Sequence, residues 1–148
     1  MATSKRQDKV KQIDAELRKL CERFGVEILY AFGSRAGEVR AAVDAGCDIA
    51  ESATSDVDIG AKLSPDRKAS IREKVELAMR LEDLFGIGKV DLVSLSDADP
   101  FLAVNIIRGE RLFSVDERLA DEYDLYVLRR AGDLAYFERR RIESVPNR

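Results

Sequence analysis

The stretch TSDVDIGAKL, residues 54–63, sets two aspartates into a run of strand-forming residues. Successive side chains of a β-strand point to opposite faces of the sheet, so this segment is two-sided. Its apolar side chains share one face, and the other face consists of Asp56, Asp58, Gly60 and Lys62. Two carboxylates about 7 Å apart along a strand repel each other unless water or a cation lies between them. Taken alone, the segment fits a solvated edge strand as well as a cation site.

The length and composition of the chain indicate one globular domain over residues 1–148. The 148 residues are enough for a sheet covered by helices, and 45% of them are hydrophobic while 36% are charged. No apolar run approaches the roughly 20 residues that span a bilayer. The polar start, MATSKRQDKVKQ, lacks the apolar core of a signal peptide. We therefore expect a cytoplasmic protein that has no membrane partner.

The residue types that the chain lacks narrow its chemistry. It contains no histidine, which excludes Ser-His-Asp and Cys-His catalysis and zinc sites built on histidine. Any metal must then be held by oxygen atoms, as magnesium, manganese and calcium are. The net charge of −3 argues against a broad basic surface for extended nucleic acids. Cys21 and Cys47 are expected to be unpaired thiols, with Cys21 in the core.

Hydrophobic periodicity predicts helices and strands that alternate along the chain. The expected helices span about residues 4–24, 65–85, 100–109 and 116–144, with a further helix between the first two strands, and the expected strands span 26–32, 54–63, 89–95 and 110–115. The strand VEILYAF is apolar throughout, which is typical of a central strand covered on both faces. This order predicts an α/β or α+β domain with a single mixed β-sheet flanked by helices.

Two further motifs bear on the aspartates. GSRAG follows the central strand directly, and its glycine allows backbone N–H groups to approach a ligand closely. Ser34 and Arg35 add a hydroxyl donor and a cation suited to phosphate. Asp91 is a third acid set within a strand. If these strands are neighbours, three carboxylates converge opposite a phosphate-binding turn, an arrangement that binds a divalent metal between protein and nucleotide.

The motifs LYAFGSRAG, SDVDIG and KVDLVSL, in this order, resemble the signature of the polymerase-beta-type nucleotidyltransferase superfamily. The short chain is similar to its minimal, MNT-type members. The resemblance covers roughly residues 24–115 and implies that superfamily's fold, with an added helix at each end. The spacer between the first two motifs is longer here than in minimal members, so we expect residues 38–53 to be an inserted or extended helix and loop.

The resemblance implies a site and a reaction. It implies catalytic, metal-binding carboxylates at Asp56, Asp58 and Asp91, and nucleotide-binding residues at Gly33, Ser34 and Arg35. The metal would be Mg²⁺ or Mn²⁺, and the reaction would move AMP from ATP to a hydroxyl acceptor with release of pyrophosphate. Lys62, on the face of the aspartates, is a further candidate for phosphate binding, although a surface lysine without that role is the commoner case.

The resemblance also implies a partner. MNT-type proteins are commonly encoded with a HEPN-type toxin, which they neutralise by transferring AMP to one of its tyrosines, so the chain is expected to be an antitoxin. Two alternatives remain open: an antitoxin that acts by contact alone, and a small-molecule transferase of the aminoglycoside type, although those enzymes usually carry an added helical domain. In the last helix, the aromatic side chains of Tyr123, Tyr126 and Phe137 fit either a core or an interface with a partner or a second copy.

Overall fold

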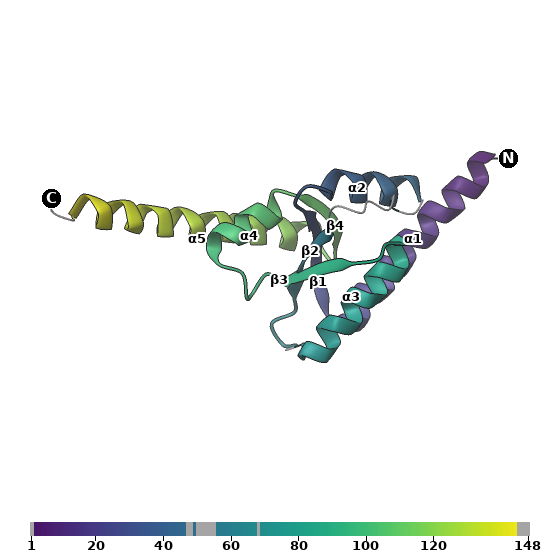
Figure 1. Cartoon of the computed structure of the whole chain (residues 1–148), viewed down its shortest axis with the longest axis horizontal. Helices are drawn as coiled ribbons and strands as arrows, with labels where there is room; N and C mark the ends of the chain where they lie inside the picture. The colour runs from purple at the N-terminus through teal and green to yellow at the C-terminus, as the bar shows by residue number, and fades with distance from the viewer. Residues whose placement is uncertain (1, 47–48, 50–55, 68, 145–148) are drawn as a thin grey trace.

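The computed structural model describes residues 2–46, 49, 56–67 and 69–144 (Figure 1). Within these residues five helices and four strands alternate in the predicted order. They are α1 (Ala2–Phe24), β1 (Val26–Phe32), α2 (Ala36–Ala45), β2 (Val57–Leu63), α3 (Ile71–Phe85), β3 (Val90–Ser94), α4 (Pro100–Ile107), β4 (Glu110–Ser114) and α5 (Glu117–Ser144).

The four strands form one mixed sheet in the order β3-β2-β1-β4. β1 is antiparallel to both of its neighbours, whereas β2 and β3 run parallel. The mixed sheet and the central position of VEILYAF are therefore confirmed. β2 also lies inside the sheet, so the interpretation of the aspartate strand as a solvated edge strand is wrong.

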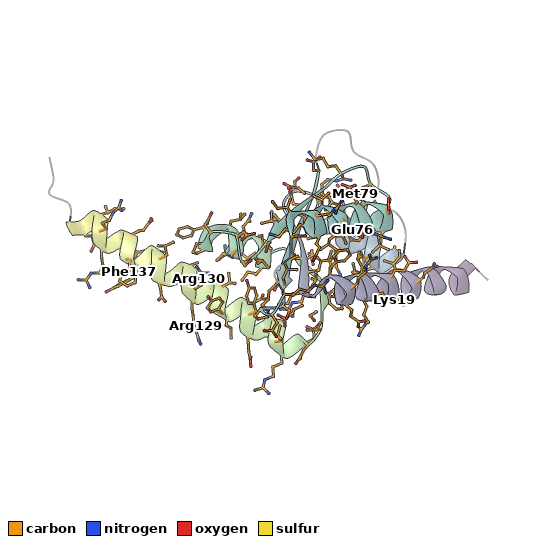
Figure 2. The ribbon with its side chains drawn as sticks, turned by 90° about the horizontal axis from the view of Figure 1, so that it is seen from below. Lys19, Glu76, Met79, Arg129, Arg130 and Phe137 are labelled. Atoms are coloured by element: carbon orange, nitrogen blue, oxygen red, sulfur yellow. The ribbon has the colours of Figure 1, made fainter. Side chains whose placement is uncertain are left out.

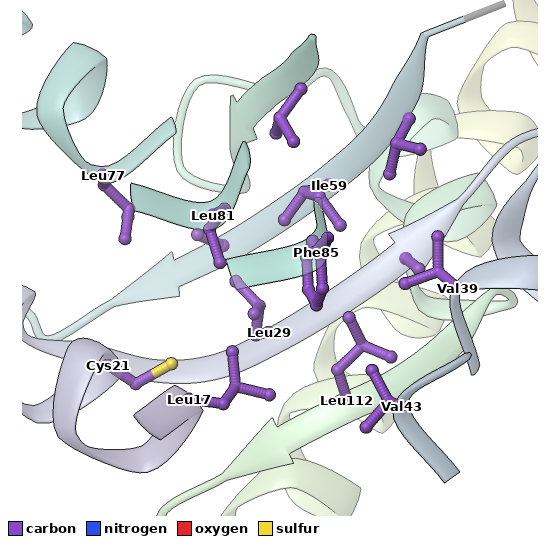
Figure 3. Packing of buried hydrophobic residues seen from close by; sticks show 14 of the residues in the cluster. Leu17, Cys21, Leu29, Val39, Val43, Ile59, Leu77, Leu81, Phe85 and Leu112 are labelled. Carbon is purple, nitrogen blue, oxygen red and sulfur yellow. The ribbon is translucent and has the colours of Figure 1, made fainter. Parts of the chain in front are cut away.

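Helices α1, α2 and α3 cover one face of the sheet, and the main core lies between them and the strands (Figure 3). β2 contributes alternate apolar residues to this core, namely Val57, Ile59 and Ala61. The helices contribute an apolar stripe each, as their three- and four-residue spacing requires. Cys21 belongs to this cluster, is unpaired, and has its thiol pKa raised to about 12 by burial.

Helices α4 and α5 cover the opposite face, where a second apolar cluster forms. Gly60 of β2 lies under α4 so closely that a Cβ atom there would collide with Cγ2 of Ile106. The side chains of β2 thus alternate between two covered faces, as the two-sided pattern predicts. Asp58 and Lys62 lie on the α4 and α5 side, one on each side of Gly60 along the strand.

The structure refines the sequence prediction at the start of α3 and in the predicted insertion. Pro65 and Asp66 form a turn, and α3 begins only at Ile71, because Ser70 caps the helix by accepting a 3.2 Å hydrogen bond from the Glu73 N–H. The predicted insertion contains the rest of α2, which ends at Gly46 in a left-handed conformation with φ 67°. Ile49 is buried in the main core, and its N–H donates a 3.0 Å hydrogen bond to the carbonyl oxygen of Phe85. The other residues of the insertion after Gly46, including Cys47, lie outside the described residues.

Helix α5 is the longest element and extends well past the sheet (Figure 1). Its 28 residues correspond to a length of about 42 Å, whereas α4, against which it packs, has 8 residues. Only the first part of α5 can therefore be covered by α4. None of the helices within the described ranges combines the length and apolar character needed to cross a membrane.

Candidate active site

The parallel pairing of β2 and β3 sets two aspartates side by side. Asp58 and Asp91 are direct partners in the register. Neighbouring strands lie about 4.8 Å apart, and paired residues point to the same face of a sheet. The two carboxylates therefore project together from the α4 and α5 side, near the beginning of both strands.

Like charge dominates the surroundings of Asp58. Burial raises the pKa of its carboxyl group, and the negative charges of Asp91 and Asp56 raise it further. In the described part of the chain, no basic side chain forms an ion pair with Asp58 or Asp91. The ionised form of Asp58 is thus disfavoured by the protein itself, and a cation placed between the carboxylates would relieve the repulsion.

Asp56 lies just before β2 and is directed toward a different group. Its carboxylate forms a 3.4 Å ion pair with the ammonium group of Lys89, the residue that precedes β3. Both side chains are exposed, so this pair contributes little to stability. Asp56 contributes negative charge near Asp58, but the structure does not bring its carboxylate together with the other two into a three-ligand group.

The turn after β1 lies against Asp58. Phe32, the last residue of β1, is the register partner of Asp58, and Gly33 then turns the chain with a positive φ of 77°. A Cβ atom on Gly33 would lie 2.5 Å from Oδ2 of Asp58, so both the conformation and the close approach require glycine. The predicted phosphate-binding turn and the aspartate strand are therefore direct neighbours.

The two residues after Gly33 differ in exposure. Ser34 is exposed at the turn. Arg35 is buried, directly precedes α2, and forms a 3.2 Å ion pair with Glu38. Ser34 directly follows Gly33, and α2 begins at Ala36. A hydroxyl group and a helix N-terminus therefore follow the turn that contacts Asp58, and such groups bind phosphate oxygens well.

Lys62 lies away from this turn. It is four residues beyond Asp58, which is about 13 Å along a strand. Its ammonium group forms a 2.5 Å ion pair with Glu27 and lies 5.2 Å from the centre of the Tyr123 ring. The structure therefore does not bring Lys62 to the aspartates, and the half-buried, paired lysine is not a solvated surface residue either.

Sequence reasoning missed a polar network near Lys62. Tyr30 of β1 donates a 2.5 Å hydrogen bond to Asp124 of α5, and Arg111 of β4 donates to the same carboxylate at 2.8 Å. Burial, followed by the hydrogen bond to Asp124, raises the pKa of the Tyr30 hydroxyl. The available signal was a tyrosine within a buried strand, because a buried phenol must find a partner. The network fixes α5 to the sheet.

The donor set at the strand ends can be tested against a divalent cation. Within the described ranges, no group of three or more acidic or cysteine side chains is arranged to hold a metal ion. Magnesium, however, is commonly held by one or two carboxylates, with phosphate oxygens and water filling the remaining positions. Asp58 and Asp91 fit that form of site, in which a nucleotide completes the ligand set.

Comparison with known families agrees with this geometry. The family described as polymerase beta, nucleotidyltransferase matches residues 15–118, which include β1, β2 and β3 and thus all three motifs. No curated protein sequence matches the chain.

Solved structures show the same fold at low sequence identity. A toxin–antitoxin structure with AMP-PNP matches with a TM-score of 0.63 and 18% identity, covering 88% of this chain and 95% of that chain. A structure of a tri-AMPylated Shewanella oneidensis HEPN toxin in complex with MNT antitoxin matches with a TM-score of 0.61 and 17% identity, covering 90% and 96%. A mutant of the MntA toxin–antitoxin complex matches with a TM-score of 0.62 and 18% identity.

Proposed function

The chain belongs to the polymerase beta nucleotidyltransferase family, and from this premise we propose that it transfers AMP from ATP to a hydroxyl group of a partner protein. One observation carries the proposal. Asp58 and Asp91 are paired across two parallel strands beside the Gly33 turn, with no basic partner in the described part of the chain. A protein keeps such uncompensated like charge most readily where a cation and a nucleotide bind.

The carboxylates would hold the metal. Asp58 and Asp91, with Asp56 as a further ligand once it leaves Lys89, are the residues suited to Mg²⁺ or Mn²⁺. When bound, the divalent cation would neutralise phosphate charge and favour deprotonation of the attacking hydroxyl. Asp91 is the more exposed of the paired acids, and we assign it as the acceptor of the hydroxyl proton.

The Gly33 turn would hold the nucleotide. The backbone N–H groups at Gly33 and the hydroxyl of Ser34 donate to the β- and γ-phosphates, and the buried Arg35 adds positive charge beneath them. In the reaction the acceptor oxygen attacks the α-phosphorus, the bond from that phosphorus to the bridging oxygen breaks, and pyrophosphate leaves with the electron pair.

The fold of the solved relatives suggests the partner. One of these structures is an AMPylated HEPN toxin in complex with its MNT antitoxin, and it matches 90% of this chain. We infer that this chain is likewise the antitoxin of a cytoplasmic HEPN-type toxin, which is the acceptor protein.

A second candidate function is neutralisation by contact alone. The exposed distal half of α5 favours it, because a surface of this kind can bind a partner without chemistry. The paired carboxylates of Asp58 and Asp91 favour the enzyme, since contact alone would not require them.

A labelling experiment separates the two functions. The purified chain is incubated with MgCl₂, ATP labelled at the α-phosphate, and a HEPN-type protein from the same organism. We expect the toxin band to carry label with the wild type and with the control Asp97→Asn, an exposed loop aspartate. Asp91→Asn should give no label. A neutralised toxin without label would assign the contact function, and equal labelling by Asp91→Asn would remove Asp91 from the site.

A further inference from the structure

From Leu125 onward, helix α5 presents a mainly apolar seam that the fold does not use. Its members recur at alternating steps of three and four residues, the spacing of a helix that packs along another helix. They are Leu125, Leu128, Gly132, Ala135, Arg139 and Ile142. All six are exposed, including Leu125 at 53%, Leu128 at 43% and Ile142 at 70%.

This seam is distinct from the face by which α5 joins the core. Ala120 and Val127 are buried against the α4 side, and Tyr123 packs partly buried beside them. Tyr123 is therefore core, which settles one part of the aromatic stripe predicted from the sequence. From Gly132 to Glu143 every residue except Leu134 is exposed, so the seam continues where the core face ends. This part of α5 extends beyond the sheet (Figure 1).

Gly132 gives an independent indication of close approach. Glycine is among the least favourable residues in a helix interior, yet Gly132 lies in the middle of α5. A Cβ atom there would meet nothing within 4 Å, so packing within the chain does not require glycine. A second helix that crosses α5 closely would require it, because only a small residue lets two backbones approach.

The charge around the seam suggests what covers it. Residues 128–143 contain five arginines and three acids, whereas the first part of α5, residues 117–127, contains four acids and one arginine. Arg129 and Arg130 project from the exposed part of the helix (Figure 2), and Arg139 lies within the seam itself. A partner surface with apolar side chains and a rim of carboxylates would complement this arrangement.

A second copy of the chain complements it less well. Pairing two seams would set Arg139 of each copy among apolar side chains, without an acid on either seam to pair with it. It would also bring two basic segments together, and like charges across an interface are unfavourable.

We propose that the seam is the docking surface for an acidic-rimmed helix of the partner protein, the same protein that accepts AMP. The identity of this partner rests on the proposed function. Asp124 binds α5 to Tyr30 in β1, the strand that leads directly to Gly33. A partner held on α5 is thereby fixed relative to the catalytic strand ends.

The test measures binding in EDTA without nucleotide, so that docking is separated from chemistry. The probe is a HEPN-type protein from the same organism, titrated calorimetrically into the full chain. Leu128→Glu and Gly132→Leu should weaken binding by about tenfold or more. Tyr126→Glu adds the same charge at a similarly exposed position on the other side of the helix and should bind like the wild type, as should Asp58→Asn. Binding should also weaken with salt.

Each other outcome contradicts the docking proposal or separates it from the proposed function. Unchanged binding by Leu128→Glu, no binding by the wild type, or insensitivity to salt would overturn it. A wild-type dimer in light scattering that Leu128→Glu converts to a monomer would assign the seam to a second copy instead. If the wild type docks through the seam but transfers no AMP, the proposed function fails and the docking surface stands.

Discussion

The two ends of β2 differ in whether the charged side chains on one face of the sheet have partners of opposite charge. At the beginning of the strand, Asp58 faces Asp91, and both carboxylates lack a basic partner in the described part of the chain. Four residues further on, Lys62 pairs with Glu27, and nearby Tyr30 donates to Asp124. Neither end is fully buried, so burial alone does not explain the difference.

The difference shows which charges serve the fold. At the Lys62 end of β2, which we call the paired end, the ion pair and the hydrogen bond of the buried hydroxyl offset the cost of desolvation, and Tyr30 joins β1 to α5. At the Asp58 end, which we call the unpaired end, the cost of desolvation is not offset, since burial and the acidic neighbours raise the pKa of Asp58. That end is therefore expected to matter for chemistry and the other for stability.

The largest effect should come from the unpaired end. Asp91→Asn keeps the size of the side chain but removes a charge that we propose holds the metal and accepts the proton. We expect AMP transfer to fall by at least about a hundredfold, the scale of a lost electrostatic group in an active site. The initial rate of label transfer measures this. A rate within a few-fold of the wild type would contradict the claim that the unpaired end of β2 serves the chemistry.

The next effect tests the paired end. Asp124→Ala leaves the buried Tyr30 hydroxyl without its acceptor and removes a partner of Arg111. The free energy of unfolding should fall by about 2–3 kcal/mol, measured by urea denaturation. Asp121→Ala removes a more exposed partner of Arg111 and should cost less than about 1 kcal/mol. Equal losses in the two variants would show that the network does not depend on its buried member.

The fold could be predicted from the sequence because its signals are local. Apolar periodicity predicted the strands and most of the helices, and the alternation in TSDVDIGAKL predicted the faces of β2. Helix α2 was expected only as part of an inserted segment, and it begins at Ala36, within the predicted turn. A local signal misled at Pro65, where the turn chemistry was taken for a helix start although Ser70 is the cap. The partners of the Lys62 ammonium group could not be predicted, because only the sheet register and the packing of α5 bring Glu27 and Tyr123 near it.

The site could be predicted in part for the same reason. The proposal that Asp58 and Asp91 carry the chemistry followed from the order of the motifs, while their direct pairing is seen only in the parallel register of β2 and β3. The contact of Asp56 with Lys89 likewise depends on where the two strands begin.

A smaller effect should separate nucleotide binding from catalysis at the unpaired end. Ser34→Ala removes the exposed hydroxyl beside Gly33. The affinity for Mg-ATP should weaken by about 1 kcal/mol or more, which is at least roughly fivefold, because one hydrogen bond to a charged group is lost. Calorimetry measures it, with Ser96→Ala as the control in an exposed loop. Unchanged affinity would remove Ser34 from the site.

The smallest effect on activity is expected from Lys62. Lys62→Met keeps the alkyl chain and leaves Glu27 without its ion-pair partner. AMP transfer per folded molecule should be unchanged, while the free energy of unfolding should fall by about 1 kcal/mol. A tenfold loss of transfer with normal stability would return Lys62 to the nucleotide site.

The central claim is that Asp58 and Asp91 are held close together for a cation, at a cost to the fold without it. The pKa of Asp58 is higher in the folded chain than in the unfolded chain. Asp58 therefore does not lower the free energy of unfolding at a pH below its unfolded pKa, and it lowers this free energy increasingly as the pH rises to the folded pKa. At neutral pH, Asp58→Asn should therefore melt at the same temperature as the wild type or higher in EDTA. Mg-ATP binding should stabilise only the wild type.

Thermal melting of wild type and Asp58→Asn at pH 7, in EDTA and in Mg-ATP, tests this claim most directly. We predict a rise in melting temperature with Mg-ATP for the wild type and little or none for Asp58→Asn, whose melting in EDTA equals or exceeds that of the wild type. Equal stabilisation of both proteins by Mg-ATP, or a variant that melts well below the wild type in EDTA, would contradict the account.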